Sequence, residues 1–295
     1  MTALRELPFF FECAGESLLG VVSVPAEAAE VGVLVVVGGP QYRVGSHRQF
    51  VKLARFLAAR GVPCMRFDYR GMGDASGAAR DFEDVSLDIG AAIDAFFKAQ
   101  PGLRRVVLWG LCDGASAVCF YPAASDPRVA GSVLLNPWVH TEAGEAKVFL
   151  KHYYLQRLID PSFWKKLLGG GVRVGQSLRS LLSIAKAARS SGAASEPAAG
   201  ADHSVALPER MRRGLAVRDE EPVAIFLSGK DYVAREFEAA LASSPAWQAL
   251  MARGNVDVQR FPDADHTLSG AGEVDAVSAA TFDWLVAKGL APARA

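Results

Sequence analysis

Short apolar runs and helix-like segments alternate along the first half of the chain. The runs typical of strands lie at residues 7–13, 17–24, 31–37, 62–69, 105–109 and 132–135. Residues 46–60 have apolar side chains three and four positions apart, which predicts a helix, and helices are also predicted at 84–98 and 115–121. The first two runs predict an antiparallel pair. The alternation that follows predicts a parallel, doubly wound sheet with helices on both faces.

This alternation stops at residue 140 and returns after residue 220. Residues 149–158 and 177–188 have helical spacing, and residues 190–200 are rich in Ser, Ala, Gly and Pro. We interpret residues 140–220 as a helical cap or lid inserted over the ligand-binding edge of the sheet. A long crossover with an irregular loop is the alternative. Strands are then predicted at 222–227 and 256–261, with helices at 235–253 (interrupted near residue 244) and 273–288. The predicted core is therefore residues 1–139 and 221–295.

Composition narrows the class of protein. The chain has 295 residues, is 51% hydrophobic, and balances 32 Lys and Arg against 32 Asp and Glu. That length and apolar content suit one large α/β domain, and the charge balance argues against nucleic-acid binding. The four cysteines have neither paired nor metal-ligand spacing, and no apolar stretch predicts a membrane span. We expect free thiols in a reducing cytoplasm and no metal or cofactor, while a peripheral membrane contact and the oligomeric state stay open.

Residues 106–117 are the stretch with the clearest chemistry. An apolar strand leads into Gly110-Leu111-Cys112-Asp113-Gly114, and small helix-forming residues follow. This is the Gly-x-nucleophile-x-Gly pattern of a strand-to-helix elbow, with Cys112 in the position that usually holds Ser. Strand and helix cross closely there, so the flanking residues must be small, and the helix N-terminus favours a thiolate. A buried structural cysteine in a Gly-rich turn is the alternative.

Polar residues at the carboxyl ends of later strands complete a catalytic set. Asp231 follows the strand at 222–227, and His266 follows the strand at 256–261. Nucleophile, acid and His in this chain order is the order of an α/β-hydrolase triad. Cys112 would be the nucleophile, His266 the general base, and Asp231 the carboxylate that orients it. Asp263 and Asp265 are alternatives for the acid because they neighbour His266 in sequence.

Two further groups of residues are candidates for contact with a substrate. The backbone N–H groups of Gly39, which follows the strand at 31–37, and Asp113 are predicted to form an oxyanion hole. Gln41, Arg43 and His47 come next in the chain, and His140 opens the insertion. These four side chains are candidates for substrate binding, although a solvated helix start explains the first three equally well.

With these residues in hand, the chain resembles the α/β-hydrolase superfamily. Residues 68–77 are similar to the loop after the fourth strand in serine aminopeptidase-like and monoacylglycerol-lipase-like hydrolases. Residues 38–48 and 110–116 together resemble the exosortase A system-associated hydrolases, type 1, which occur in bacteria that make exopolysaccharide. The resemblance implies the α/β-hydrolase fold, with a mostly parallel, eight-stranded sheet, and a cytoplasmic protein linked to that system. The chain departs from the superfamily at Cys112, where Ser is usual, and at Val37, where His is usual.

Three functions are compatible with these residues. The first is hydrolysis of a small-molecule acyl ester or thioester through an acyl-enzyme at Cys112, because a thiolate favours substrates with good leaving groups. The second is acyl transfer, in which a sugar or lipid hydroxyl resolves the same acyl-enzyme. The third is a non-catalytic binding protein on the hydrolase fold.

Overall fold

The computed structural model describes residues 5–27, 29–39, 41–139 and 204–292. By its contacts the chain divides into one unit of residues 1–141 and 203–295 and a second unit of residues 142–202. The second unit lies outside the described residues, as do the insertion helices predicted at 149–158 and 177–188. The helical cap therefore stays a prediction. Everything below concerns the first unit.

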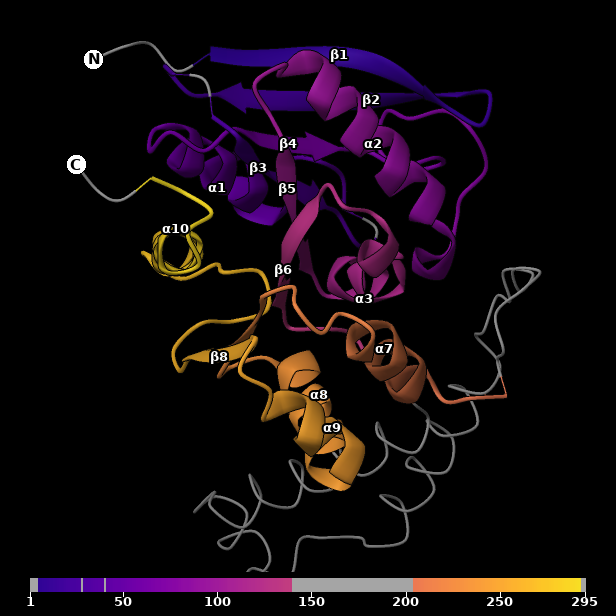
Figure 1. The fold of residues 1–295 in the computed structure, drawn as a ribbon, viewed down its shortest axis with the longest axis vertical. Helices are drawn as coiled ribbons and strands as arrows, with labels where there is room; N and C mark the ends of the chain where they lie inside the picture. The colour runs from indigo at the N-terminus through magenta and orange to yellow at the C-terminus, as the bar shows by residue number, and fades with distance from the viewer. Residues whose placement is uncertain (1–4, 28, 40, 140–203, 293–295) are drawn as a thin grey trace, which may run out of the picture. The chain divides into compact units, whose positions relative to one another are not determined.

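An eight-stranded sheet forms the centre of this unit (Figure 1). Its strands are β1 (Arg5–Cys13), β2 (Glu16–Val24), β3 (Val31–Val36), β4 (Cys64–Phe67), β5 (Arg105–Leu111), β6 (Val129–Leu135), β7 (Val223–Ser228) and β8 (Val256–Phe261). Their order across the sheet is β1-β2-β4-β3-β5-β6-β7-β8. β2 pairs antiparallel with β1 and with β4, and every later pairing is parallel. The predicted mostly parallel, eight-stranded sheet is confirmed.

Helices connect the parallel strands, and a last helix follows β8. They are α1 (Gln49–Ala58), α2 (Ser86–Ala99), α3 (Asp113–Phe120), α7 (Leu207–Ala216), α8 (Tyr232–Ser243), α9 (Pro245–Met251) and α10 (Glu273–Ala287). Short 3-10 turns lie at Ser46–Arg48, Phe82–Asp84 and Ala123–Ser125. The interruption predicted near residue 244 separates α8 from α9, where the Ser244 side chain accepts the Trp247 N–H and Pro245 begins the new helix.

The central strands have continuous apolar runs because both faces of the sheet are buried there. In β3, Val33 and Val35 pack into the cluster that includes α1 and α10, whereas Leu34 and Val36 pack into the cluster with α2 and α3. Successive strand side chains point to opposite faces, so only a strand covered on both sides needs apolar residues at every position. Figure 1 shows α1 and α10 on one side of the sheet and α2 and α3 on the other.

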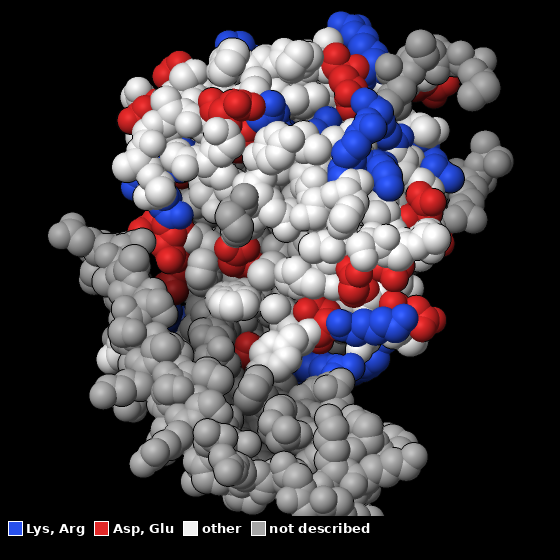
Figure 2. Space-filling view, turned by 180° about the vertical axis from the view of Figure 1, so that it is seen from behind, with Lys and Arg blue, Asp and Glu red and all other residues white. Residues whose placement is uncertain are grey.

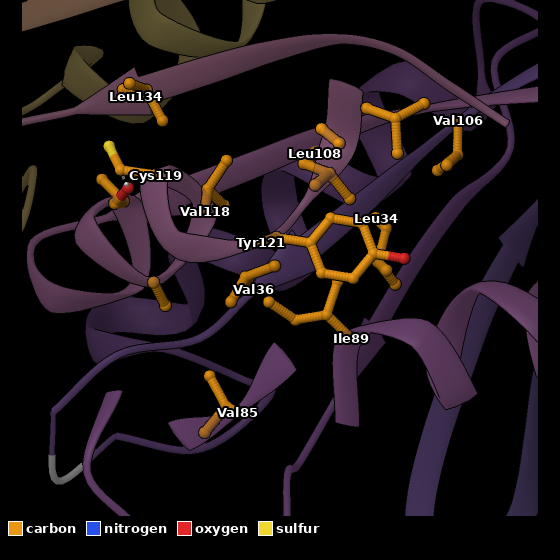
Figure 3. Packing of buried hydrophobic residues seen from close by; sticks show 14 of the residues in the cluster. Leu34, Val36, Val85, Ile89, Val106, Leu108, Val118, Cys119, Tyr121 and Leu134 are labelled. Carbon is orange, nitrogen blue, oxygen red and sulfur yellow. Dashed lines mark hydrogen bonds between the residues drawn. The ribbon is translucent and has the colours of Figure 1, made fainter. Parts of the chain in front are cut away.

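Helix α3, which follows the elbow, is sunk deeply into the second cluster. Figure 3 shows Val118 from this helix near Val36 of β3 and Leu108 of β5, and Cys119 on the side of Leu134 of β6, all in one cluster. Six of the eight residues of α3 are buried. The core therefore fixes the helix, and the helix fixes the residue at its N-terminus.

Helix α7 belongs to this core although its residues lie inside the predicted insertion. Its Met211 and Leu215 are buried in the cluster that contains α3. Just after it, Arg218 is 1% exposed and donates to Ser132 Oγ and to the carbonyl of Tyr121. The division between the two units at residues 202 and 203 accordingly precedes the predicted boundary at 220.

The surface of the described unit is mixed in charge. On the face in Figure 2, basic and acidic side chains lie interspersed among uncharged ones. Among the helices that the structure describes, none is long and apolar enough to cross a membrane.

Candidate active site

Cys112 lies at the turn between β5 and α3. Its backbone has φ 59° and ψ −127°, a conformation that costs a non-glycine residue about 1–3 kcal/mol. Its N–H donates to Leu135 O (3.0 Å) and its carbonyl accepts the Trp138 N–H (3.2 Å), so the strained turn is anchored to β6 and the loop after it. The thiol is half-buried and free, as are the thiols of Cys13, Cys64 and Cys119.

The two elbow glycines are required by close backbone contact. A Cβ at Gly110 would lie 2.5 Å from Gly114 O, and a Cβ at Gly114 would lie 2.4 Å from Val36 O. Any larger residue would push the strand and the helix apart. The sequence pattern predicts an elbow for the same reason, because the strand and the helix cross too closely for larger flanking residues.

Asp231 and His266 meet at the carboxyl ends of β7 and β8. His266 Nδ1 lies 2.7 Å from Asp231 Oδ2, and Asp231 is 3% exposed. The other carboxylate oxygen of Asp231 accepts the Val233 N–H and caps α8, which holds the carboxylate in one orientation.

The charges around His266 favour its protonated form. Hydrogen bonds to Asp231 and to the Cys112 side chain raise the pKa of His266 to about 10, against burial, which lowers it. The imidazole is therefore hydrogen-bonded to the carboxylate, and the Cys112 side chain lies near enough to raise its pKa. The structure brings the three predicted residues together from loops that are far apart in the sequence.

The two alternative carboxylates face elsewhere. Asp265 accepts the N–H groups of Thr267 and Ser269, and its pKa falls to about 2, chiefly because the Ser269 hydroxyl also donates to it. Asp263 is exposed at 93% and pairs with Lys230. Asp265 thus shapes the turn that carries His266, and Asp231 is the carboxylate in contact with the imidazole.

Sequence reasoning missed the groups that support the elbow. The buried Asn136 and Ser228 exchange hydrogen bonds between the ends of β6 and β7, from Nδ2 to Oγ (3.0 Å) and from N–H to Oδ1 (2.8 Å). The Ser116 hydroxyl donates to Trp138 O (2.7 Å) and to Cys112 O. Asn136 has φ 47°, and the Asn-Pro pair after an apolar strand was the available signal.

The predicted oxyanion donor Gly39 has a partner within the protein. Its N–H donates to Asp113 Oδ2 (2.6 Å), and Asp113 Oδ1 accepts the Gly114 N–H (3.1 Å). Burial raises the pKa of Asp113, while these N–H groups lower it. The loop after β3 and the N-terminus of α3 do meet as predicted, but a carboxylate lies between their donors.

The side chains proposed to bind substrate have different surroundings. The Arg43 guanidinium pairs with Asp68, which is fully buried, and with Asp74 (2.6 Å). Gln41 Oε1 accepts the Ser46 N–H within its own loop. Both residues therefore brace the loop after β3 in this structure.

His47 is exposed, with φ 53°, in the turn before α1. His140 lies outside the described residues. Among the residues that are described, no group of three or more His, Cys, Asp or Glu side chains is arranged to hold a metal ion.

Two curated proteins share part of this sequence. The chain is 32% identical over 91 residues to the polyketide transferase grgF of a Penicillium species, which covers 30% of this chain and 31% of that protein. It is 33% identical over 102 residues to the Homo sapiens protein ABHD12B, which covers 33% of this chain and 27% of that protein. Each match spans less than a third of the relative's own length.

Solved structures match over almost the whole chain. The Pyrococcus furiosus esterase Pf2001 aligns with a TM-score of 0.63 at 14% identity, covering 96% of this chain and 93% of that one. GrgF from Penicillium aligns with a TM-score of 0.62 at 14% identity, covering 97% and 99%. Est1E of Butyrivibrio proteoclasticus, solved with ferulic acid, aligns with a TM-score of 0.58 at 15% identity, covering 95% and 98%. At these identities the likeness concerns the fold.

The sequence model described as the alpha/beta hydrolase family matches residues 33–280. That range runs from β3 into α10 and includes the elbow, Asp231 and His266. The chain belongs to the alpha/beta hydrolase family.

Proposed function

We propose that the protein hydrolyses an acyl ester or thioester through a covalent intermediate on Cys112. One observation carries this proposal. The thiol at the strained elbow lies close enough to His266 to raise its pKa, and that imidazole is itself fixed by a buried carboxylate 2.7 Å away. A nucleophile, a base within reach and a third group that orients the base are what covalent acyl transfer needs.

The reaction would proceed in two steps. In the first, Cys112 Sγ attacks the acyl carbonyl, its proton resides on His266, and the C–S bond forms as the carbonyl oxygen becomes an oxyanion. Collapse of that intermediate breaks the bond to the leaving group, which takes the proton from His266. In the second, His266 takes a proton from water as the hydroxide attacks the thioester. Collapse of this intermediate breaks the C–S bond and releases the acid, which leaves the Cys112 thiolate beside protonated His266. Asp231 stabilises the imidazolium in both steps.

Acyl transfer is the second candidate, and one observation favours it. The relative that shares 32% identity over 91 residues has a name that describes a transferase. In that case a hydroxyl group of a sugar or lipid replaces water in the second step. A non-catalytic binding role is the third candidate, and it predicts a thiol at position 112 no more reactive than an ordinary one.

The setting of the reaction is also a proposal. The resemblance of residues 38–48 and 110–116 to exosortase-associated hydrolases supports a substrate from exopolysaccharide or envelope assembly. Four free cysteines support a reducing compartment such as the cytoplasm.

A chain-length screen tests the proposal. Wild type and Cys112→Ala would be compared on p-nitrophenyl esters and acyl-CoA thioesters of increasing acyl length, with Cys64→Ala as the matched control because that thiol is buried in β4. We expect turnover by wild type and Cys64→Ala and none by Cys112→Ala. Equal turnover by all three would contradict the proposal. Added alcohols then separate the candidates, since an acylated alcohol at low alcohol concentration indicates transfer.

A further inference from the structure

The Asp113 side chain occupies a position that the proposed chemistry needs for another group. Its carboxylate accepts the N–H of Gly39 at 2.6 Å and that of Gly114 at 3.1 Å. The Asp113 N–H itself is also among the backbone groups that interact with this carboxylate. The N–H groups of Gly39 and Asp113 are the pair on opposite sides of the Cys112 elbow that would hold an oxyanion. Of these two, the Gly39 N–H donates to a carboxylate of the chain itself.

The backbone leaves room for this arrangement. A Cβ at Gly38 would lie 1.9 Å from Asp113 Oδ1 and 2.3 Å from Gly114 N, so only glycine permits the carboxylate and the helix N-terminus to approach the loop. Gly39 has φ 61°, and a Cβ there would meet Asp113 Oδ1 at 3.7 Å. Gly38 therefore leaves room for the carboxylate, whereas Gly39 is favoured by its positive φ.

An oxyanion and this carboxylate compete for the same donors. Each N–H has one hydrogen to give, and two negative oxygens at hydrogen-bonding distance from one donor repel each other strongly in a partly buried site. Burial raises the pKa of Asp113, and the Asp81 carboxylate raises it further, whereas the N–H groups of Gly39 and Gly114 lower it. The Asp113 carboxylate is thus held by hydrogen bonds against an environment that disfavours its charge.

We propose that the Asp113 carboxylate is a displaceable occupant of the oxyanion hole, which an acyl substrate must expel before its carbonyl oxygen reaches the Gly39 N–H. The proposal rests on the proposed role of Cys112. Displacement requires binding energy from parts of the substrate remote from the reacting carbonyl. Asp113 therefore determines specificity: short acyl groups, which bind weakly, react slowly, and longer ones that make more contacts react faster.

Two substitutions and two reagents test this proposal. Asp113→Ala removes the carboxylate from the Gly39 N–H, and Asp113→Asn keeps the shape of the side chain without its charge. The probes are p-nitrophenyl acetate, whose reaction forms an oxyanion, and iodoacetamide, whose reaction with the thiol does not. We expect Asp113→Ala to raise the rate of acylation by p-nitrophenyl acetate about tenfold or more, since a single oxyanion-hole donor is worth roughly 100- to 1000-fold. Asp113→Asn should give a smaller rise. The rate of alkylation by iodoacetamide should change less than about twofold in both.

Acyl length and a neighbouring charge provide the controls. On p-nitrophenyl decanoate the rise in Asp113→Ala should be smaller than on the acetate, because that substrate can expel the carboxylate of wild type. Asp81→Asn alters the nearby charge but leaves the Asp113 carboxylate in place, and it should change acylation less than about twofold. If Asp113→Ala does not fold, Asp113→Asn still decides the question.

Two results would overturn the proposal. Slower acylation in Asp113→Ala, with wild-type rates in Asp113→Asn, would mean that the side chain holds the loop in place. Unchanged acylation in both would mean that the Gly39 N–H has no part in the reaction. Failure of the proposed function looks different, because acylation of Cys112→Ala would then equal that of wild type.

Discussion

The two ends of helix α3 hold cysteines seven positions apart with opposite surroundings. Cys112, at the N-terminus, is half-buried, has φ 59° and lies near enough to His266 to raise its pKa. Cys119, near the other end, is 1% exposed, and burial raises its pKa to about 12. Its thiol donates to Ala115 O at 3.4 Å, within the same helix. The residue type is the same at both ends, so the local structure decides which thiol can react.

The difference has two physical causes. Cys112 lies at the helix N-terminus beside His266, whereas burial in apolar packing raises the pKa of Cys119. In addition, a Cβ on Gly214 of α7 would lie 2.0 Å from Cys119 O, so α7 covers that end of α3 closely. The buried end of the helix fixes its position in the core. The other end places Cys112 where a substrate can reach it.

Removing each thiol in turn is the strongest test of which cysteine reacts. Cys112→Ala should lower ester turnover by about a thousandfold or more, because the covalent route is lost. Cys119→Ala should leave turnover within about twofold of wild type. Steady-state rates on a p-nitrophenyl ester measure both, and an equal loss in the two variants would contradict the assignment.

Removing the His266 imidazole tests whether it is the group that makes Cys112 more reactive than Cys119. His266→Ala should lower turnover by about 100- to 10,000-fold, the usual contribution of a positioned general base. Asp231→Asn should also lower it, because the neutral amide no longer stabilises the imidazolium. As a control, Asp265→Asn should lower turnover less than Asp231→Asn, since Asp265 contacts Thr267 and Ser269 rather than His266.

The buried position of Cys119 predicts that its substitution lowers the stability of the protein. Cys119→Ala should lower the free energy of unfolding by about 1–2 kcal/mol, since it leaves a small cavity between α3 and its neighbours. Cys112→Ala should cost less, because that side chain is half-buried. Denaturant titration of both variants measures the difference, and a larger loss for Cys112→Ala would reverse the comparison.

The raised pKa of His266 predicts a pH effect with a definite sign. The pKa is about 10 in the folded state against an ordinary value of 6.5 for histidine. Its contribution to stability is therefore fully present below pH 6.5 and is lost as the pH rises through about 10. Wild type should exceed His266→Gln in unfolding free energy by more at pH 6 than at pH 10. A difference that grows with pH would contradict this sign.

Much of this fold could be predicted because the signals are local. The unbroken apolar runs of β3 and β5, the helix periodicity of α1, and the Gly-x-Cys-x-Gly spacing each depend on neighbours in the chain. The segment at 207–218 was harder to predict. Its short amphipathic helix resembles an insertion helix in sequence, and only the tertiary packing of Met211 and Arg218 reveals that it belongs to the core.

The candidate site also has a part that could be predicted from the sequence and a part that could not. The chain order of Cys112, Asp231 and His266 could be predicted, because each follows a strand that the sequence identifies. The Asp113 carboxylate on the Gly39 N–H could not, since it depends on a rotamer and on an approach between loops 74 positions apart. The Asn136–Ser228 pair likewise joins residues 92 positions apart. Polar contacts across neighbouring strand ends leave no periodic signal in the sequence.

The most direct test of the account is the rate at which iodoacetamide labels each cysteine of the native protein near pH 7, located by mass spectrometry. Cys119 and Cys64, both buried and both with a pKa near 12, serve as internal references. We predict rapid labelling at Cys112 that slows markedly in His266→Ala, with negligible labelling of the other two until the protein unfolds. Labelling at Cys112 no faster than at Cys119, or unaffected by loss of His266, would contradict it.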